Sequence, residues 1–507
     1  MEYIRLENFR CFEDTGKVYL APLMLLVGAN SSGKSSFLKQ FPLIKQSVRQ
    51  RRNGVFLWNS TTGIDLDKFS NVLRDGEERM VIEYGIGNLD LIKQRSMSSR
   101  RKVKGIPNVK VMIEMRKANE RFEYLSKLTI SFYDQLIEIF FAENEIVELL
   151  MINGKKLNGL EEKIIGAPTN SLLPRLIYIK DGHIDEDMSH NCRELVHELQ
   201  YRDVDDSSPK YSRVHYISLF SLDRLDGQKN TQAWLSRYFK DPSEELRLND
   251  IYIWYKLNRI LDSLNFFFLD LAENITYVEP VRAIAKRYYR IDNVATDEIN
   301  SDGTNLAMFL YNLPKNELTA FQRWTKKLFK FNVRLKSSEG HVQLQIEIPD
   351  SRNIRNMSDM GFGYSQILPI LAIIWKALKD VGNSEIYQIG MGAHEPTRII
   401  VIEQPELHLH PRFISMFAFM LTKIITDIKK TEKRLSIIIE THSEAMIDAI
   451  GTQIANDKSF DVKDVKILLF NASEEFNIPE IETNYIKEAH FDRKGFLMDW
   501  PYGFFSI

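Results

Sequence analysis

The chain has 507 residues, and its 67 Lys and Arg nearly balance its 69 Asp and Glu, for a formal net charge of −2. This length allows roughly two to four domains with a large core, and the charge balance argues against a protein that binds nucleic acid over its whole surface, although it permits a local basic patch. Only two cysteines occur, Cys11 and Cys192, which excludes a disulfide framework and favours the reducing cytosol.

The N-terminal region predicts strands followed by a helix. It is charged from Glu2, unlike a signal peptide, and no apolar run in the chain reaches the roughly 18 residues of a membrane span. Residues 2–28 first alternate and then run apolar, in "YIRLENFRCF" and "KVYLAPLMLLVG", which predicts two or three strands. The helix follows in "SSFLKQFPLIKQSVRQ", where Leu38, Phe41 and Ile44 begin an apolar stripe.

The rest of the chain predicts an α/β protein. Residues 80–150 are rich in strands with Asn- and Gly-marked turns, which indicates an antiparallel lobe. Residues 185–275 are helical and aromatic, and residues 328–350 form a hairpin pattern. From residue 359, helices alternate with continuous apolar strands such as "TRIIVIE" and "LSIIIE". Such alternation predicts a parallel or mixed sheet covered on both faces.

A phosphate-binding loop is indicated by "GANSSGKSS", which fits G-x-x-x-x-G-K-[ST] at Gly28, Gly33, Lys34 and Ser35. The motif follows an apolar strand and opens a helix, which distinguishes it from a glycine-rich turn. Its backbone N–H groups are expected to face phosphate oxygens, with Lys34 on the β- and γ-phosphates and the Ser35 hydroxyl on Mg²⁺. The further loop positions expected to contact the nucleotide are Asn30, Ser32 and Ser36.

Two later strand ends carry polar residues. Glu403 ends "RIIVIE", where it is expected beside the phosphate loop as a water-mediated Mg²⁺ ligand; the alternative is a strand-end acid in a salt bridge. His442 follows "IIIET" and is expected near the γ-phosphate; the alternative is a structural histidine.

A second anion site is predicted at "DMGFGYSQILPIL". Gly361 and Gly363 precede Ser365 and Gln366, and a helix begins there. A site across the sheet cannot serve the phosphate loop of the same chain. The pattern therefore favours two chains that meet head to tail, each offering this helix to the ATP of the other.

These four elements, in this order, resemble the ABC-type ATPases of the branch containing SMC, RecF and overcoming-lysogenization-defect (OLD) proteins. "IRLENFRCFED" is similar to the opening strand of that branch. Three further segments resemble OLD-like ATPases of bacterial defence operons, such as the ATPase subunit of Septu systems and related retrons. These segments are "SDGTNLAMFL" (301–310), "IEQPELHLHP" (402–411) and "DWPYGFFSI" (499–507).

The resemblance implies an ABC-type ATPase head with ATP and Mg²⁺ as cofactors, acting as a homodimer or higher oligomer through its ATP sites. It assigns residues 1–180 to an N-terminal ATPase lobe, 181–280 to a helical insertion and 281–507 to a C-terminal ATPase lobe. The resemblance implies Walker A roles for Lys34 and Ser35 and the Walker B role for Glu403. It implies that Gly363 to Gln366 stand in for the signature sequence, although they do not read LSGGQ. His442 is implied to be the switch histidine. Gln40 and Gln46 are poor candidates for a Q-loop residue.

The position after Glu403 raises the question of turnover, because Gln404 stands where many nucleotide hydrolases have a carboxylate. An amide cannot accept a proton from water, but it can orient one. Glu406 is expected to turn back to the site past Pro405 and to assist a slow hydrolysis in which Gln404 and His442 position water and γ-phosphate. The alternative is a salt-bridge or capping role for Glu406, with ATP serving to lock a dimer.

Two other constellations have weaker functional interpretations. Residues 181–192, with His183, Asp185, Asp187 and His190, can be read as a metal site or as solvated caps. Residues 93–110 hold seven basic side chains, which indicates either a nucleic-acid contact or an exposed loop.

Three functions are compatible with these patterns. Only 65 residues follow His442, without a DxD pair, so no Toprim nuclease is expected in this chain. The first hypothesis is a slowly hydrolysing sensor or regulatory subunit of an antiphage complex with a separate effector, a nuclease. The alternatives are a RecF-like DNA-repair ATPase and a non-hydrolysing, nucleotide-locked scaffold.

Overall fold

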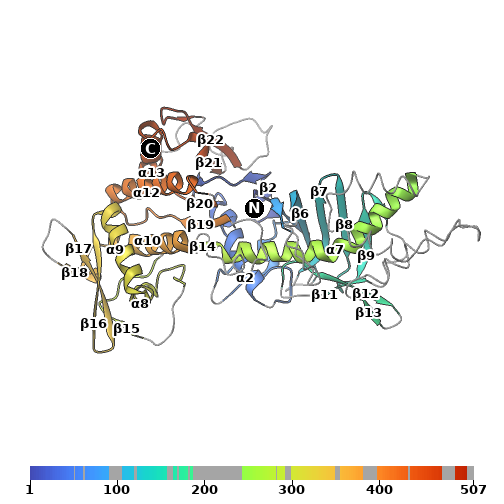
Figure 1. The fold of residues 1–507 in the computed structure, drawn as a ribbon, viewed down its shortest axis with the longest axis horizontal. Helices are drawn as coiled ribbons and strands as arrows, with labels where there is room; N and C mark the ends of the chain where they lie inside the picture. Colours follow the sequence, from blue (N-terminus) through green and yellow to red (C-terminus); the bar gives the residue numbers. More distant parts are fainter. Residues whose placement is uncertain are drawn as a thin grey trace, which may run out of the picture. The chain divides into compact units, whose positions relative to one another are not determined.

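The computed structural model forms two compact units (Figure 1). The first, here called the β unit, is formed mainly by residues 1–19 and 43–272, and the second, the P-loop unit, by residues 20–42, 273–384 and 395–507. The residues that the structure describes are 1–50, 52–60, 63–90, 105–118, 123–156, 164–167, 171–180, 183–185, 242–280, 282–291, 298–348, 354–380, 397–431, 434–470 and 486–498.

A nine-stranded antiparallel sheet forms the β unit, in the order β10-β9-β8-β7-β6-β5-β1-β2, with β3 also paired to β1. Alternating side chains along β7 are buried, as expected of a sheet with one covered face. The strands are β1 Tyr3–Phe9, β2 Phe12–Asp14, β3 Val18–Tyr19, β5 Arg79–Leu89, β6 Ile106–Lys117, β7 Glu123–Phe132, β8 Gln135–Phe141, β9 Val147–Ile152 and β10 Lys155–Lys156. The antiparallel lobe expected at 80–150 is therefore confirmed.

A long helix, α7 (Pro242–Glu273), packs in the β unit. Asn258 brackets the backbone of Leu176, donating to its carbonyl oxygen at 2.8 Å and accepting from its N–H at 3.0 Å. Phe268 is fully buried and its ring meets that of Tyr84. Among the side chains of α7 that the structure describes, Leu257, Leu261 and Phe268 are fully buried, so this part of the helix belongs to a core. The remaining elements here are α2 Gln40–Arg49, which begins in the P-loop unit, α3 Phe69–Val72, β11 Ile164–Ala167, β12 Arg175–Lys180 and β13 His183–Asp185.

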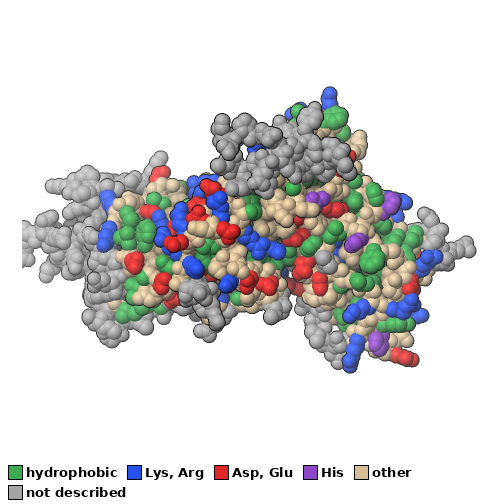
Figure 2. Space-filling model, turned by 180° about the vertical axis from the view of Figure 1, so that it is seen from behind, with side chains coloured by type: hydrophobic (Ala, Val, Ile, Leu, Met, Phe, Trp, Pro, Cys, Tyr) green, Lys and Arg blue, Asp and Glu red, His purple; other side chains and the backbone are tan. Residues whose placement is uncertain are grey.

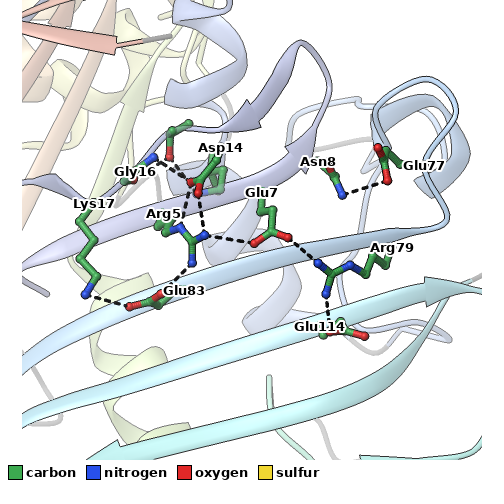
Figure 3. Close-up of polar contacts among 12 residues, drawn as sticks. Arg5, Glu7, Asn8, Asp14, Gly16, Lys17, Glu77, Arg79, Glu83 and Glu114 are labelled. Carbon is green, nitrogen blue, oxygen red and sulfur yellow. Dashed lines mark hydrogen bonds and ion pairs between the residues drawn. The ribbon is translucent and has the colours of Figure 1, made fainter. Parts of the chain in front are cut away.

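Charged side chains connect β1, β2, β5 and β6 across the sheet of the β unit (Figure 3). Arg5 contacts Asp14 at 2.6 Å and Glu7 at 3.2 Å, and Arg79 contacts Glu7 at 2.8 Å and Glu114 at 3.2 Å. Each of these carboxylates has a cationic partner, so we interpret the network as a set of ion pairs that connects neighbouring strands. On the face drawn in Figure 2, Lys and Arg side chains are interspersed with Asp and Glu.

The P-loop unit is built on a seven-stranded sheet in the order β14-β19-β20-β4-β21-β22-β23. The first five strands pair in parallel, and β22 and β23 are antiparallel. Every residue of β4 is buried, as expected of a central strand covered on both faces. The strands are β4 Leu23–Gly28, β14 Ile275–Val278, β19 Thr397–Glu403, β20 Arg434–Glu440, β21 Val465–Phe470, β22 Ile486–Phe491 and β23 Leu497–Met498.

Helices α8, α9, α10, α12 and α13 contribute to one buried cluster with alternate residues of the central strands, including Leu25, Ile402 and Ile439. The helices of this unit are α1 Lys34–Leu38, α8 Leu306–Asn312, α9 Lys315–Phe329, α10 Phe362–Asp380, α12 Pro411–Lys429 and α13 Glu444–Asn456, with the 3-10 turns η3 Met357–Asp359 and η4 Val462–Asp464. A smaller antiparallel sheet contains the predicted hairpin and consists of β15 Tyr289–Arg290, β16 Asn332–Ser338, β17 His341–Glu347 and β18 Ile354–Asn356.

The expected α/β class, with a mixed P-loop sheet and an antiparallel lobe, is confirmed. The division at 1–180, 181–280 and 281–507 stays a prediction, because residues 186–241 lie outside the described residues. The tail at 499–507 lies outside them as well. Among the described helices, none combines the length and the apolar character that crossing a membrane requires.

Candidate functional site

The phosphate-loop motif lies between a buried strand and a helix, as its spacing predicts. β4 ends at Gly28, and α1 begins at Lys34 after Gly33, whose φ of 96° lies in the left-handed region that glycine tolerates. A Cβ atom on Gly28 would lie 2.8 Å from the carbonyl oxygen of Phe470, so this position also needs the absent side chain. The sequence therefore specifies the loop through both backbone conformation and close packing.

Lys34 folds back into its own loop. Its side chain is 2% exposed, and its Nζ donates to the carbonyl oxygens of Gly28 at 2.9 Å and Ala29 at 2.6 Å. Burial lowers the pKa of Lys34 from its usual value. Of the other predicted loop contacts, Ser32 is buried, Asn30 is exposed and Ser36 is half-buried. A buried ammonium group that is held only by neutral oxygens is a suitable partner for phosphate.

The strand order separates Glu403 from the phosphate loop. β20 lies between β19 and β4, so the strand end adjacent to the loop belongs to Glu440, the register partner of Glu403. Glu440 is 2% exposed, and its Oε2 accepts from the Ser35 hydroxyl at 2.7 Å. The sequence prediction missed Glu440, although "IIIE" ends a buried strand in the same way as "IVIE" does.

Glu403 has its contact on the other side, toward β14. Its Oε1 accepts from the Tyr277 hydroxyl at 2.7 Å, and its side chain is 4% exposed. Burial raises the pKa of Glu403 to about 7, although the Tyr277 hydrogen bond opposes the rise.

Gln404 faces Glu440. It has a φ of 41°, its N–H donates to the backbone carbonyl of Glu440 at 2.9 Å, and its Nε2 lies 3.4 Å from Glu440 Oε1. The chain then turns, with the Leu407 N–H donating to the carbonyl of Gln404 at 3.3 Å. This turn brings the Glu406 side chain back toward the end of β20.

Glu406 meets the backbone of His442. Its Oε1 accepts from the His442 N–H at 2.6 Å, and its Oε2 is buried without a hydrogen-bond partner. Burial raises the pKa of Glu406, and burial together with the nearby Lys34 charge lowers the pKa of His442. The His442 Nε2 is also buried without a partner. Two polar atoms at this edge thus remain available to a ligand or to water.

A buried arginine that no sequence pattern indicated completes the edge. Arg282 is 2% exposed, and its Nη2 donates to the carbonyl oxygens of Glu403 at 2.8 Å and Gln404 at 3.3 Å. Its Nε and Nη1 are buried without partners. Burial lowers the pKa of Arg282 to about 10. The nearby carboxylates of Glu406 and Glu403 oppose this decrease. Arg282 therefore connects the segment after β14 to the turn that carries Gln404 and Glu406.

The glycine-rich helix start is only partly accessible in the single chain. Gly361 is exposed and Gly363 is half-buried, whereas Ser365 and Gln366 are buried. The Ser365 hydroxyl donates to the carbonyl of Phe362 at 2.7 Å, within its own helix turn. Any contact with a second chain would therefore begin at the glycine backbone.

The remaining residues considered from the sequence have structural contacts or lie outside the described side chains. Gln46 makes hydrogen bonds to the backbone of Leu57 and Ile64 within the β unit, which gives it a structural role. Gln40 is fully buried, and both of its amide atoms lack partners. Among the described residues no cluster of three metal-ligating side chains occurs. The side chains of residues 181–192 and the basic residues 93–104 lie outside the described residues.

The donor set suits a magnesium ion. Ser35 supplies a hydroxyl, and Glu440 and Glu403 supply buried carboxylates. Mg²⁺ prefers such hard oxygen ligands and usually combines one or two carboxylates with substrate phosphates.

Three solved structures cover most of the chain at low identity. The Smc head bound to the C-winged helix domain of ScpA is 10% identical, with 97% of each chain covered and a TM-score of 0.34. An Smc head with an extended coiled coil bound to the C-terminal domain of ScpA, from Pyrococcus furiosus, is 12% identical, with 97% of this chain and 96% of that chain covered and a TM-score of 0.36. The SMC head domain from Thermotoga maritima is 10% identical, with 92% and 95% covered and a TM-score of 0.32.

No curated protein matches the chain. The model of the AAA ATPase domain family matches residues 1–447, which include the phosphate loop and both strand-end glutamates. Because the match spans most of the sequence, the chain belongs to the AAA ATPase domain family.

Proposed function

We propose that the chain binds ATP with Mg²⁺ and hydrolyses it slowly, as an ABC-type ATPase of the SMC, RecF and OLD branch. One observation carries the proposal: buried Lys34 and half-buried Ser35 lie in a phosphate loop, and the serine hydroxyl contacts the carboxylate of the buried strand-end residue Glu440 at 2.7 Å. Lys34 binds the β- and γ-phosphates and Ser35 contributes to the Mg²⁺ site. Bound Mg²⁺ would neutralise phosphate charge and polarise the γ-phosphoryl group.

The roles of the remaining edge residues follow from their chemistry. Gln404 has no proton-accepting group, so it orients the attacking water through its amide. His442 contacts the γ-phosphate through its unpartnered Nε2. Glu406 assists by fixing the His442 backbone, through the 2.6 Å hydrogen bond to its N–H. With no carboxylate at position 404, hydrolysis is slow.

Replacing Glu406 by glutamine tests this assistance. The amide oxygen can still accept from the His442 N–H, but the charge is lost, which weakens that hydrogen bond. We expect phosphate release to fall by about tenfold, as for the loss of roughly 1.4 kcal/mol, with ATP affinity unchanged within about twofold. The matched control is Glu488→Gln, at an exposed ion pair with Lys466. If the Glu406→Gln variant releases phosphate at the wild-type rate, the charge of Glu406 has no part in the mechanism.

Two copies are proposed to close over the nucleotide, as a homodimer or higher oligomer. The accessible backbone at Gly361 and Gly363, at the start of the 19-residue helix α10, supports this arrangement. A long helix presents unpaired N–H groups and a positive dipole end at its start, and both favour a phosphate from another chain. Phe362, which is 57% exposed beside His408, would be covered in the same contact.

We further propose that the ATP-bound assembly is the sensor or regulatory subunit of an antiphage defence complex with a separate nuclease effector. Support comes from the resemblance of "SDGTNLAMFL" and "IEQPELHLHP" to OLD-like defence ATPases. The test is to purify the tagged chain together with the products of its neighbouring genes. We expect a nuclease to co-purify with the wild-type chain in the presence of ATP, and we expect Lys34→Ala to abolish this co-purification. If the wild-type chain and the Lys34→Ala variant are both isolated alone, the defence role is contradicted.

A nucleotide-locked scaffold is the second candidate, and Gln404 is the observation that favours it. A scaffold would bind ATP but release no phosphate above the Lys34→Ala background. Phosphate release from the purified chain therefore separates the two functions.

A further inference from the structure

The two strand-end glutamates, Glu403 and Glu440, lie on strands at different positions relative to the phosphate loop. Glu403 and Glu440 are register partners on parallel strands, so both side chains emerge at the same edge of the sheet. β20, which carries Glu440, pairs directly with β4, whereas β19, which carries Glu403, does not. The carboxylate nearest to the loop is therefore that of Glu440.

The contacts of Glu440 connect it to the loop serine. Its Oε2 accepts from Ser35 Oγ at 2.7 Å, and its Oε1 lies 3.4 Å from Gln404 Nε2. Glu440 is 2% exposed, and the charge of Lys34 in the same loop lies close enough to interact with it. A carboxylate and a hydroxyl that lie together supply the hard oxygen ligands that Mg²⁺ prefers beside substrate phosphates.

Glu403 is held in a different way. Its carboxylate accepts from the Tyr277 hydroxyl on β14, the neighbouring strand on the side away from β4. Arg282 holds its backbone carbonyl at 2.8 Å. These contacts anchor Glu403 toward β14, away from Ser35.

We propose that Glu440, together with the Ser35 hydroxyl, is the main protein ligand for the Mg²⁺ that accompanies ATP, and that Glu403 supports the ion from one strand away. The proposal rests on the proposed ATP binding and reassigns the principal metal carboxylate within it. Gln404 then orients the Glu440 carboxylate through its amide.

The matched pair Glu440→Gln and Glu403→Gln tests this assignment. Each variant removes one charge with little change of shape, at equivalent positions on neighbouring strands. The measurements are binding of a fluorescent ATP analogue in EDTA, and the same binding as Mg²⁺ is titrated. For Glu440→Gln we expect the Mg²⁺ concentration at half-saturation to rise by roughly 10- to 100-fold, with affinity in EDTA unchanged within about twofold. For Glu403→Gln we expect a rise of less than about threefold.

A second readout does not depend on nucleotide fluorescence. Mn²⁺ replaces Mg²⁺, and its paramagnetic resonance spectrum reports the bound fraction in the presence of the ATP analogue. Glu440→Gln should lose bound Mn²⁺, and Glu440→Asp, which keeps the charge, should retain more of it than the glutamine variant does. Thermal unfolding of each variant verifies that it is folded.

The results that would overturn the assignment are specific. A larger Mg²⁺ shift for Glu403→Gln than for Glu440→Gln returns the metal to Glu403. Equal loss in Glu440→Asp and Glu440→Gln would show that the charge of residue 440 is not what holds the ion. If instead the wild-type chain binds no nucleotide in EDTA or in Mg²⁺, the proposed function itself fails, which is a distinguishable outcome.

Discussion

Lys34→Ala is expected to weaken ATP binding by about 100-fold or more and, with it, to abolish phosphate release. Lys34 is 2% exposed and places its ammonium group inside the phosphate loop, where little water competes for its charge. Phosphates would replace the carbonyl oxygens of Gly28 and Ala29 as its partners. Each charge-assisted hydrogen bond contributes about 1.5–3 kcal/mol, so two of them correspond to a loss of affinity of about 100-fold or more. Titration of a fluorescent ATP analogue measures this loss.

The control for Lys34 is Lys430→Ala, which removes a lysine side chain that is 67% exposed and pairs with Asp427 at the surface. Its ATP affinity and unfolding temperature should equal those of the wild type, because exposed pairs contribute little. Binding by Lys34→Ala at wild-type affinity would show that the nucleotide does not use this loop.

Arg282→Met is expected to give the largest loss of stability at the site. Methionine fills a similar volume but removes the donor to the carbonyl oxygens of Glu403 and Gln404, together with a cation beside Glu406. Removing one partner from a buried charge arrangement is strongly destabilising, so we expect the free energy of unfolding to fall by about 2–4 kcal/mol. Thermal and denaturant unfolding of the nucleotide-free protein measure the change.

The loss in Arg282→Met should depend on pH. Burial raises the pKa of Glu403 to about 7 and raises the pKa of Glu406 as well. Below a pH of about 7 the Glu403 carboxyl group is protonated in the folded state and loses little when the cation is removed. Above it the group is ionised, and the variant raises its folded-state pKa further, so the stability of the variant falls as pH rises through this range. The raised pKa of Glu406 acts in the same direction. The gap from the wild type should therefore be smaller near pH 5.5 than near pH 8.

Arg287→Met provides the comparison for Arg282. Arg287 is an arginine on the same segment, its side chain is 58% exposed, and it pairs with Asp359 at the surface. Its replacement should change the free energy of unfolding by less than about 1 kcal/mol, with no pH-dependent gap. Equal effects of Arg282→Met and Arg287→Met would contradict the structural role of Arg282.

The local parts of this site were predictable from sequence. The phosphate loop depends on a fixed spacing between Gly28 and Ser35, and the strand before it and the helix after it are visible as an apolar run and a 3.6-residue stripe. The turn that returns Glu406 to the edge was also expected, since it lies within four residues of a strand end.

The relations across the sheet were not predictable. Which strand lies next to β4 depends on sheet order, and the Ser35–Glu440 contact joins residues 405 positions apart. Periodicity indicates that "IVIE" and "IIIE" are buried strands, but it does not indicate which one borders the loop. Tyr277 lies on the short strand β14, and Arg282 lies on the segment after it. The pairing of β14 with β19 brings both residues to the site.

The burial of Ser365 and Gln366 near the start of α10 also depends on packing that the sequence does not reveal. Ser365 and Gln366 follow two glycines, which the sequence prediction associated with an exposed anion site. Their helix α10 is buried along most of its length, and the Ser365 hydroxyl satisfies the carbonyl of Phe362. The packing of a helix against its neighbours decides such exposure, and one-dimensional spacing does not contain that information.

A magnesium-bound triphosphate is proposed to occupy the Lys34 loop beside the carboxyl ends of β19 and β20. An experimental structure of the protein with Mg²⁺ and a non-hydrolysable ATP analogue tests it most directly. We predict phosphate density at the Lys34 ammonium group, with the metal at Ser35 and the nearest carboxylate that of Glu440. Nucleotide density elsewhere, or Lys34 still bound to the carbonyl oxygens of its own loop with ATP present, would contradict the account.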